Sequence, residues 1–198
     1  MAKIKEILIG TNNKGKYKEI SDLLPKNIKK YSPIDLHIKS PDENGKTFRA
    51  NSLIKASYFS RKTNLICISD DSGLEIDLLN GKPGIYSARW GGKKNNFNIA
   101  IKKVFNEIKK IKKDWKQNEC IARFVCCLTI YWPGGKNYST EGVITGTISK
   151  KMKGKKGFGY DPIFIPDGFQ NTFGEMDPKI KMSIDHRSKA FFNLKKFF

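Results

Sequence analysis

Arginine is scarce in this chain of 198 residues, although the formal net charge is +19. Lysine therefore supplies nearly all of the positive excess. A protein dedicated to nucleic acid usually employs arginine, whose planar guanidinium makes bidentate contacts to phosphate and guanine. Abundant lysine and asparagine with little arginine is typical of a codon bias toward A and T. We therefore attribute most of the charge to composition and expect no dedicated nucleic-acid partner.

The sequence also lacks the marks of a secreted, membrane-bound or zinc-binding protein. Its start does not have the form of a signal peptide, and no run approaches the ~20 apolar residues of a membrane span. The four cysteines form no CxxC pair and all lie in apolar runs, which indicates buried free thiols in a reducing compartment. Only two histidines could join them as zinc ligands. We expect a cytoplasmic protein without membrane association.

The pattern of apolar segments predicts an α/β fold with a mixed sheet. Strands are expected at residues 4–9, 34–38, 65–68, 74–79, 120–132 and 137–148. Helices are expected at residues 16–24, 48–61, 96–113 and 183–198. The segment 120–132 is apolar at nearly every position, so we expect a long strand that is buried on both faces and followed by a hairpin turn. We expect a single domain over residues 1–198 with no separable linker.

Two adjacent carboxylates, Asp70 and Asp71, follow the apolar run at residues 65–68. That run is rich in β-branched residues and predicts a buried strand. The end of the strand would present both carboxylates at the mouth of an α/β sheet, where such folds place their sites. Paired carboxylates there hold a divalent metal or act as a base. A metal that bridges to phosphates would give this acidic spot a partner.

The segment Gly10–Lys16 follows the first expected strand and opens a helix. Its spacing fits the phosphate-loop pattern GxxxxGK, except that Tyr17 stands where a serine or threonine should be. Backbone N–H groups at a helix start attract phosphate, and Lys16 adds a positive charge. The segment predicts a phosphate site, and an ordinary turn between strand and helix is the alternative.

Three further segments carry side chains that could bind a substrate. Asn51 and Lys55 are four residues apart and share one face of the helix expected at 48–61. Two glycines flank Phe158 in the segment 157–162 and let its ring stand clear of the backbone for base stacking. A cation cluster at residues 181–187 could bind an anion or the carbonyl edge of a base. A solvated helix face and a tight turn with core aromatics are the structural alternatives for the first two.

The order and spacing of these segments resemble the non-canonical purine nucleoside triphosphate pyrophosphatases, the inosine/xanthosine triphosphate family that removes deaminated purines from the nucleotide pool. The resemblance spans essentially the whole chain. It rests on the segments 11–16, 43–55, Asp70-Asp71-Ser72-Gly73-Leu74, Pro83-Gly84-Ile85-Tyr86-Ser87-Ala88-Arg89, 157–162 and His186-Arg187. The segments 70–74 and 83–89 are close to diagnostic.

The resemblance implies that the protein hydrolyses ITP, dITP and XTP to the monophosphate and pyrophosphate, with Mg²⁺ as cofactor. It implies Asp71 as general base, Lys55 as a second catalytic residue, and Glu43 with Asp71 as metal ligands. The substrate-binding residues that it implies are Thr11, Asn12, Asn13, Lys14, Gly15 and Lys16 at the triphosphate, Ser72, Phe158 stacked on the purine, Gly159, Tyr160 and Asp161 around it, and Lys181, His186 and Arg187 at the base edge. The family usually has serine where this chain has Asp185, a carboxylate that could pair with a nearby cation and soften base readout.

The resemblance further implies an elongated mixed sheet with long central strands, two lobes flanking a substrate cleft, and a homodimer. Two other functions stay open on the residues alone. A P-loop NTPase would use Gly10–Lys16 as its phosphate loop, although Tyr17 argues against it. A basic nucleic-acid-binding protein would explain the net charge but would leave Glu43, Asp70 and Asp71 without a role.

Overall fold

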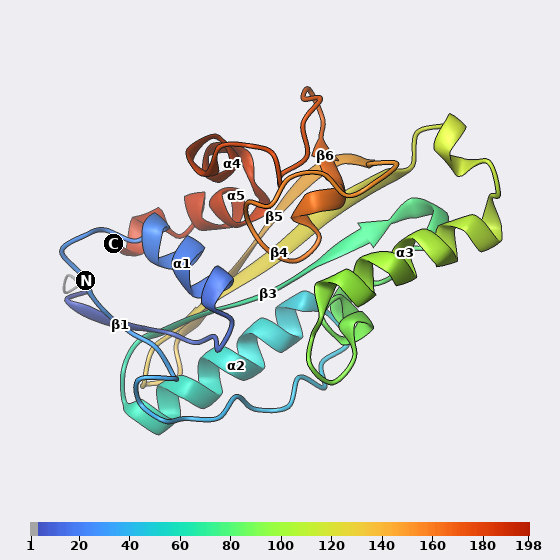
Figure 1. Ribbon diagram of the computed structural model, residues 1–198. Helices are drawn as coiled ribbons and strands as arrows, with labels where there is room; N and C mark the ends of the chain where they lie inside the picture. Colours follow the sequence, from blue (N-terminus) through green and yellow to red (C-terminus); the bar gives the residue numbers. More distant parts are fainter. Residues whose placement is uncertain (1–3) are drawn as a thin grey trace. The chain divides into compact units, whose positions relative to one another are not determined.

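The computed structural model, which describes residues 4–198, alternates strands and helices along the chain (Figure 1). The strands are β1 (Glu6–Ile9), β2 (Lys29–Tyr31), β3 (Cys67–Ile76), β4 (Ile121–Tyr131), β5 (Asn137–Ile148) and β6 (Phe164–Pro166). The helices are α1 (Lys14–Leu23), α2 (Phe48–Thr63), α3 (Phe97–Ile111), α4 (Pro178–Ile184) and α5 (His186–Phe192), joined by short 3₁₀ turns.

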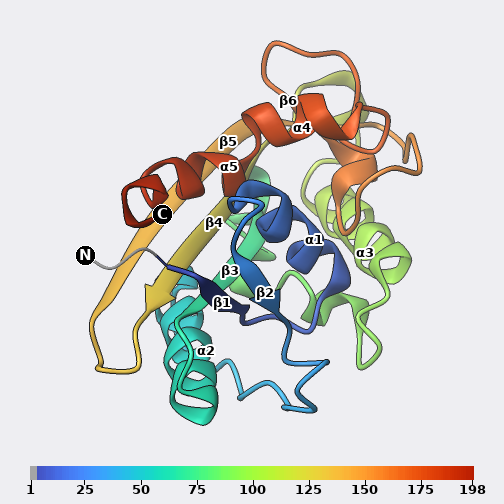
Figure 2. The same cartoon turned by 90° about the vertical axis from the view of Figure 1, so that its left-hand side faces the viewer.

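The strands lie in the sheet order β2-β1-β3-β4-β5-β6. β1 runs parallel to both β2 and β3, between which Figure 2 shows it, whereas β6 is antiparallel to β5. The sheet is therefore mixed, and the predicted α/β class is confirmed.

The chain divides into two compact units. Unit 1 contains the chain up to Asp71 together with residues 126–142 and 186–198, and unit 2 contains residues 72–125 and 143–185. Strands β3, β4 and β5 each contribute residues to both units. The expected single domain with two lobes and a cleft stays a prediction.

In unit 1, the side chains of β3 alternate between two apolar cores. Ile68 belongs to a core that includes Ile20 of α1 and Phe191 of α5. Its neighbour Cys67 packs with Phe59 of α2 in another core. Because successive strand residues point to opposite faces, β3 directs its even-numbered side chains toward α1 and α5 and its odd-numbered ones toward α2 in this unit.

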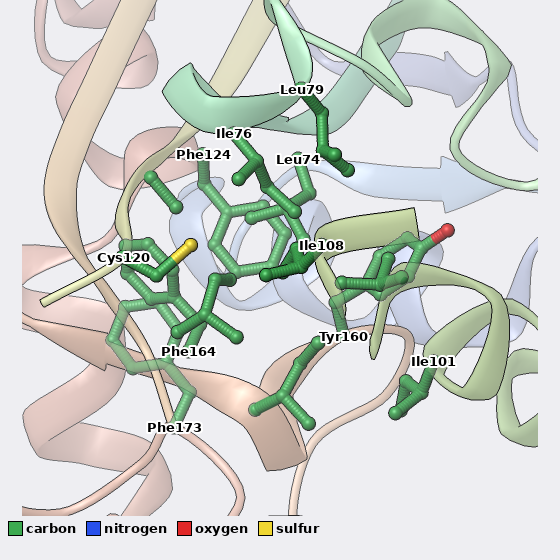
Figure 3. Packing of buried hydrophobic residues seen from close by; sticks show 14 of the residues in the cluster. Leu74, Ile76, Leu79, Ile101, Ile108, Cys120, Phe124, Tyr160, Phe164 and Phe173 are labelled. Carbon is green, nitrogen blue, oxygen red and sulfur yellow. The ribbon is translucent and has the colours of Figure 1, made fainter. Parts of the chain in front are cut away.

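Unit 2 has an apolar core of its own, built around three phenylalanines (Figure 3). The ring of Phe124 on β4 lies 4.7 Å from that of Phe164 on β6 and 6.1 Å from that of Phe173, centroid to centroid. Helix α3 adds Ile101 and Ile108, whose seven-residue spacing places them on one apolar face of the helix.

The two long strands are neighbours in the sheet and are joined by the turn at residues 133–135. Every residue of β4 from Phe124 to Tyr131 is buried, so the prediction of a strand buried on both faces is confirmed. β5 instead alternates between buried and more exposed positions from Thr140 onward, which is typical of a strand with one covered face.

The prediction of a strand at residues 34–38 is wrong. Residues 33–37 form turns in which the Ser32 hydroxyl accepts from the Asp35 N–H and His37 has a φ of 54°. The strand lies earlier, at residues 29–31, where it pairs with β1. Local turn chemistry after Ser32-Pro33 outweighs the apolar pattern of the following residues.

Two expected boundaries are also wrong. The strand expected to end at residue 68 continues as β3 through Asp70 and Asp71 to Ile76, and residues 77–79 form a 3₁₀ turn. The single helix expected at 183–198 is broken at Asp185, whose ψ of 168° is extended and separates α4 from α5. Aspartate favours this conformation immediately before a helix begins.

Candidate active site

The sequence pattern predicts that Asp70 and Asp71 form a pair of carboxylates that face the same way. The structure does not form such a pair. Both lie inside β3, so their side chains point to opposite faces of the strand. Asp71 contacts Asn51 and Lys55 of α2, and Asp70 contacts residues from α1 and α5. The two carboxylates therefore belong to separate polar clusters, both within unit 1.

The Asp71 cluster places two carboxylates around one buried lysine. Lys55 Nζ lies 2.8 Å from Glu43 Oε1 and 3.9 Å from Asp71 Oδ1. Asn51, one turn earlier on α2, donates from Nδ2 to Asp71 Oδ2 at 2.9 Å. The Asn51 side-chain oxygen accepts from the Gly45 N–H at 2.8 Å, which fixes the direction of its amide group. The Gly45 N–H thus fixes the Asn51 amide group, and Asn51 in turn orients the Asp71 carboxylate.

Burial controls the charge states in this cluster. Burial raises the pKa of Asp71, and Glu43 raises it further, against the opposing effect of Lys16, Lys55 and the Asn51 hydrogen bond. Burial would lower the pKa of Lys55, but the surrounding carboxylates outweigh it and the pKa is raised. An ammonium that stays charged beside a carboxylate with a raised pKa is an arrangement suited to general-base chemistry on an anionic substrate.

The Asp70 cluster links two cations on the other face of β3. Asp70 Oδ2 lies 3.2 Å from Lys16 Nζ and 3.2 Å from Arg187 Nη2. Burial tends to raise the pKa of Asp70, but Lys16 and Arg187 outweigh burial and hold the pKa well below its usual range. Arg187 also contacts Glu19 Oε2 at 2.8 Å and His186 Nε2 at 3.1 Å. Asp70 is therefore a buried counterion.

The loop expected to bind phosphate leads into α1 through a helix cap. Asn13 is the N-cap, and its side-chain oxygen accepts from the Lys16 N–H at 3.1 Å. The Thr11 hydroxyl accepts from the Asn13 N–H, and Asn12 donates to Ser40. The helix begins at Lys14, before the glycine and lysine that end the GxxxxGK pattern, so Lys14, Gly15 and Lys16 form its first turn.

Unit 2 holds a separate cluster built on the turn at residues 157–161. Gly157 and Gly159 have positive φ values of 72° and 68°, the left-handed region in which glycine is favoured. The buried Asp161 carboxylate accepts from the Phe158 N–H at 2.8 Å and from Lys181 Nζ at 2.7 Å. Lys181 Nζ lies 5.3 Å from the centroid of the Phe158 ring, within cation–π range.

Tyr160 and Ser72 are two further predicted site residues that lie in unit 2. The Tyr160 hydroxyl donates to the Ser87 carbonyl at 2.8 Å, and its ring packs edge-on against Phe97. Tyr160 is thus part of the core beneath the turn. Ser72 is the half-buried first residue of unit 2 on β3. Lys181 lies in unit 2, whereas His186 and Arg187 lie in unit 1, so the expected cation cluster is divided between the units.

Several contacts in these clusters were not expected from the sequence. The spacing of Asn51 and Lys55 predicts a shared helix face, but the bond from Asn51 to Asp71 joins α2 to β3 and depends on the fold. Glu19 carries no pattern that marks it as a partner of Arg187, because the two are 168 residues apart. The contact of Lys181 with Asp161 likewise joins residues that no local spacing relates.

Carboxylates are the candidate metal ligands within residues 4–198. Within this part of the chain, no cluster of three or more His, Cys, Asp and Glu side chains could hold a metal ion. Glu43 and Asp71 remain as two carboxylates that share Lys55 as a neighbour. Mg²⁺ is commonly bound by one or two carboxylates together with substrate phosphates, so this donor set fits that ion.

The fold and these clusters define an α/β enzyme whose buried carboxylates and lysines suit the hydrolysis of a phosphate anhydride. The chain belongs to the Ham1 family, whose model matches residues 7–197. Family and enzyme class are therefore as predicted, and the P-loop alternative is rejected. None of the helices within residues 4–198 combines the length and apolar character needed to cross a membrane.

Curated relatives and solved structures cover nearly the whole chain. It is 42% identical to a dITP/XTP pyrophosphatase of Oceanobacillus iheyensis over 197 residues, which cover 98% of both chains. It is 41% identical to a dITP/XTP pyrophosphatase of Rhodospirillum centenum over 93% of this chain and 90% of the relative. A HAM1 protein from Coxiella burnetii superposes with a TM-score of 0.85 at 33% identity, covering 98% of each chain.

Proposed function

We propose that this protein is a dITP/XTP pyrophosphatase, which also accepts ITP and releases the nucleoside monophosphate and pyrophosphate. Identity of about 40% to enzymes of that name over nearly the full length supports it. The observation that carries the proposal is the Asp71 cluster, in which an oriented carboxylate with a raised pKa lies beside a charged, buried lysine.

Asp71 is the general base in this proposal. Its carboxylate takes a proton from the attacking water, and Asn51 keeps one of its oxygens oriented. Lys55 stays protonated between two carboxylates and stabilises the negative charge that grows on the triphosphate. Glu43 and Asp71 are the proposed ligands of Mg²⁺. When bound, this ion would act as a Lewis acid on the phosphate oxygens.

The two ends of the substrate use different side chains. Residues 11–16 contact the triphosphate, with Lys16 as the cation among them. Phe158 stacks on the purine, in a turn that Asp161 and its bond to the Phe158 N–H hold in shape. Ser72, Gly159 and Tyr160 are assigned to substrate binding by the family resemblance.

Lys181, His186 and Arg187 are the proposed readers of the base edge. A 6-oxo purine offers an acceptor where adenine offers a donor amine, so cationic donors would be left unpaired against adenine. Each such buried unpaired group costs about 1–3 kcal/mol, and two would give discrimination on the order of 10²–10⁴. Asp185, in place of the usual serine, has an extended backbone and ends α4.

A homodimer and a cytoplasmic location complete the proposal. The dimer is inferred from the family resemblance, and sedimentation equilibrium would measure it. The location is supported by the four cysteines, which are all free and buried, as expected for a reducing compartment.

Product analysis tests the function directly. The protein would be incubated with dITP, XTP, ITP, GTP and ATP plus Mg²⁺, and orthophosphate would be measured with and without added inorganic pyrophosphatase. We expect a signal only with the added enzyme and only for dITP, XTP and ITP. Orthophosphate released without the added enzyme would instead show cleavage between the β- and γ-phosphates and contradict the proposal.

A further inference from the structure

Asp70 joins two cationic side chains that come from different helices of unit 1. Its Oδ2 atom lies 3.2 Å from Lys16 Nζ on α1 and 3.2 Å from Arg187 Nη2 on α5. The Asp70 side chain is fully buried, and those of Lys16 and Arg187 are 16% and 3% exposed. Because little water screens the electrostatic attraction, the Asp70 carboxylate interacts strongly with both cations.

Glu19 extends this arrangement to a network of four charged side chains. It lies on α1 three residues after Lys16, and its Oε2 atom is 2.8 Å from Arg187 Nη1. The four side chains carry two positive and two negative charges, and they connect α1, β3 and α5. Figure 1 shows α1 beside α5, in agreement with their direct contacts. A change at Arg187 therefore reaches Lys16 through the Asp70 carboxylate.

We infer that Asp70 is a positioning residue that couples Arg187 to Lys16, so that Arg187 sets how strongly Lys16 binds the polyphosphate of the substrate. The inference rests on the proposed function, in which Lys16 contacts the triphosphate and Arg187 the base. Asp70 competes with phosphate oxygens for the Lys16 ammonium. Arg187 weakens this competition because it shares the same carboxylate oxygen.

A ligand without a base separates this coupling from base recognition. Inorganic tripolyphosphate would be titrated calorimetrically in the presence of EDTA, so that metal binding at the neighbouring Asp71 plays no part. Arg187→Met should weaken tripolyphosphate binding at least about fivefold, the lower end of typical coupling between sites. The double variant that adds Asp70→Asn to Arg187→Met should restore the affinity to the wild-type value or above, because Lys16 then has no competing carboxylate.

Two control variants make the result specific. Arg61→Met removes the same charge from unit 1 at a residue that donates to Tyr131 and lies outside this network, and should change the affinity by less than about twofold. Arg187→Lys keeps the charge beside Asp70 and should retain most of the affinity. Circular dichroism and thermal unfolding would verify that each variant is folded.

Several results would overturn the inference. An equal loss in Arg61→Met would show a general effect of net charge. Failure of Asp70→Asn to restore binding would show that Arg187 contacts the phosphates itself or only supports the fold. If the double variant does not fold, a loss in Arg187→Lys as large as in Arg187→Met would contradict the coupling, and so would wild-type protein that does not bind tripolyphosphate.

The outcome is distinguishable from a failure of the proposed function. Restored tripolyphosphate binding without hydrolysis of dITP by the wild type would reject the enzyme and retain the coupling. Hydrolysis of dITP to pyrophosphate without restored binding would retain the enzyme and reject the coupling.

Discussion

Asp70 and Asp71 are chemically identical neighbours with opposite properties. Burial tends to raise the pKa of both, yet the pKa of Asp71 is raised and that of Asp70 is lowered. The difference follows from strand alternation, which turns Asp70 toward Lys16 and Arg187 and Asp71 toward α2. The residue pattern alone marks both carboxylates as functional and does not separate their faces, because it ends the strand before them. Only the family resemblance singles out Asp71 as the general base.

Asn51 provides a test of how Asp71 is oriented. Asn51→Ala should lower kcat for dITP by about 10–100-fold, the usual cost of losing a group that orients a catalytic ligand. KM should change less, because Asn51 holds the base and is not assigned to the substrate. Ser57→Ala on the same helix, which removes a hydroxyl bonded to the Ile54 carbonyl, is the matched control. Equal kcat values in the two variants would contradict an orienting role.

Cys67 gives a prediction that depends on pH. Burial raises the pKa of its thiol to about 12, outweighing hydrogen bonds that lower it. At pH 8 its thiolate fraction is then about 1000-fold below that of an exposed cysteine, and iodoacetamide should label it only after unfolding. The unfolded thiol ionises first as the pH rises above about 9, so this group destabilises the folded state from there upward. Rapid labelling of Cys67 in folded protein would contradict the burial.

At the scale of elements, the clearest regular patterns gave correct predictions. Helices α2 and α3 begin within one residue of the expected positions, where Thr47 and Asn96 act as caps. The two long strands also occur where expected. Strand β2 was missed because its three residues are too short to show a period. The break at Asp185 was missed because the apolar pattern continues across it.

The packing of β5 against α5 gives a prediction at this scale. A Cβ at Gly142 would collide with the backbone of His186 and Ala190. Gly142→Ala should push α5 away from the strand and lower the free energy of unfolding by about 1–3 kcal/mol. Gly134→Ala, where a Cβ would meet open space, should change it by less than about 0.5 kcal/mol. Urea denaturation measures both, and equal midpoints would show that the contact is not tight.

At the scale of the whole molecule, the family was predictable from the sequence although the geometry was not. The segments around Asp71 and residues 83–89 have a composition and order that few families share. The contacts of the clusters instead join segments far apart in the chain, such as Lys16, Asp70 and Arg187. No local spacing encodes such contacts, because they depend on which faces of β3 the helices cover.

The net charge of +19 also belongs to this scale. The clusters described here are nearly balanced locally, since Lys16, Lys55, Lys181 and Arg187 each lie beside a carboxylate. The charges proposed to bind and turn over the substrate are therefore distinct from the lysine excess. That excess governs non-specific association with polyanions, which salt would screen.

Asp71 is the proposed general base of a nucleoside triphosphate pyrophosphatase, and its replacement by asparagine is the decisive experiment. The kcat for dITP would be compared between Asp71→Asn and Asp22→Asn, the latter changing an exposed aspartate of α1 that pairs with Lys18. We predict a loss of about 10²–10⁴-fold for Asp71→Asn, in folded protein, and wild-type turnover for Asp22→Asn. Turnover of Asp71→Asn within a few-fold of the wild type would contradict the account.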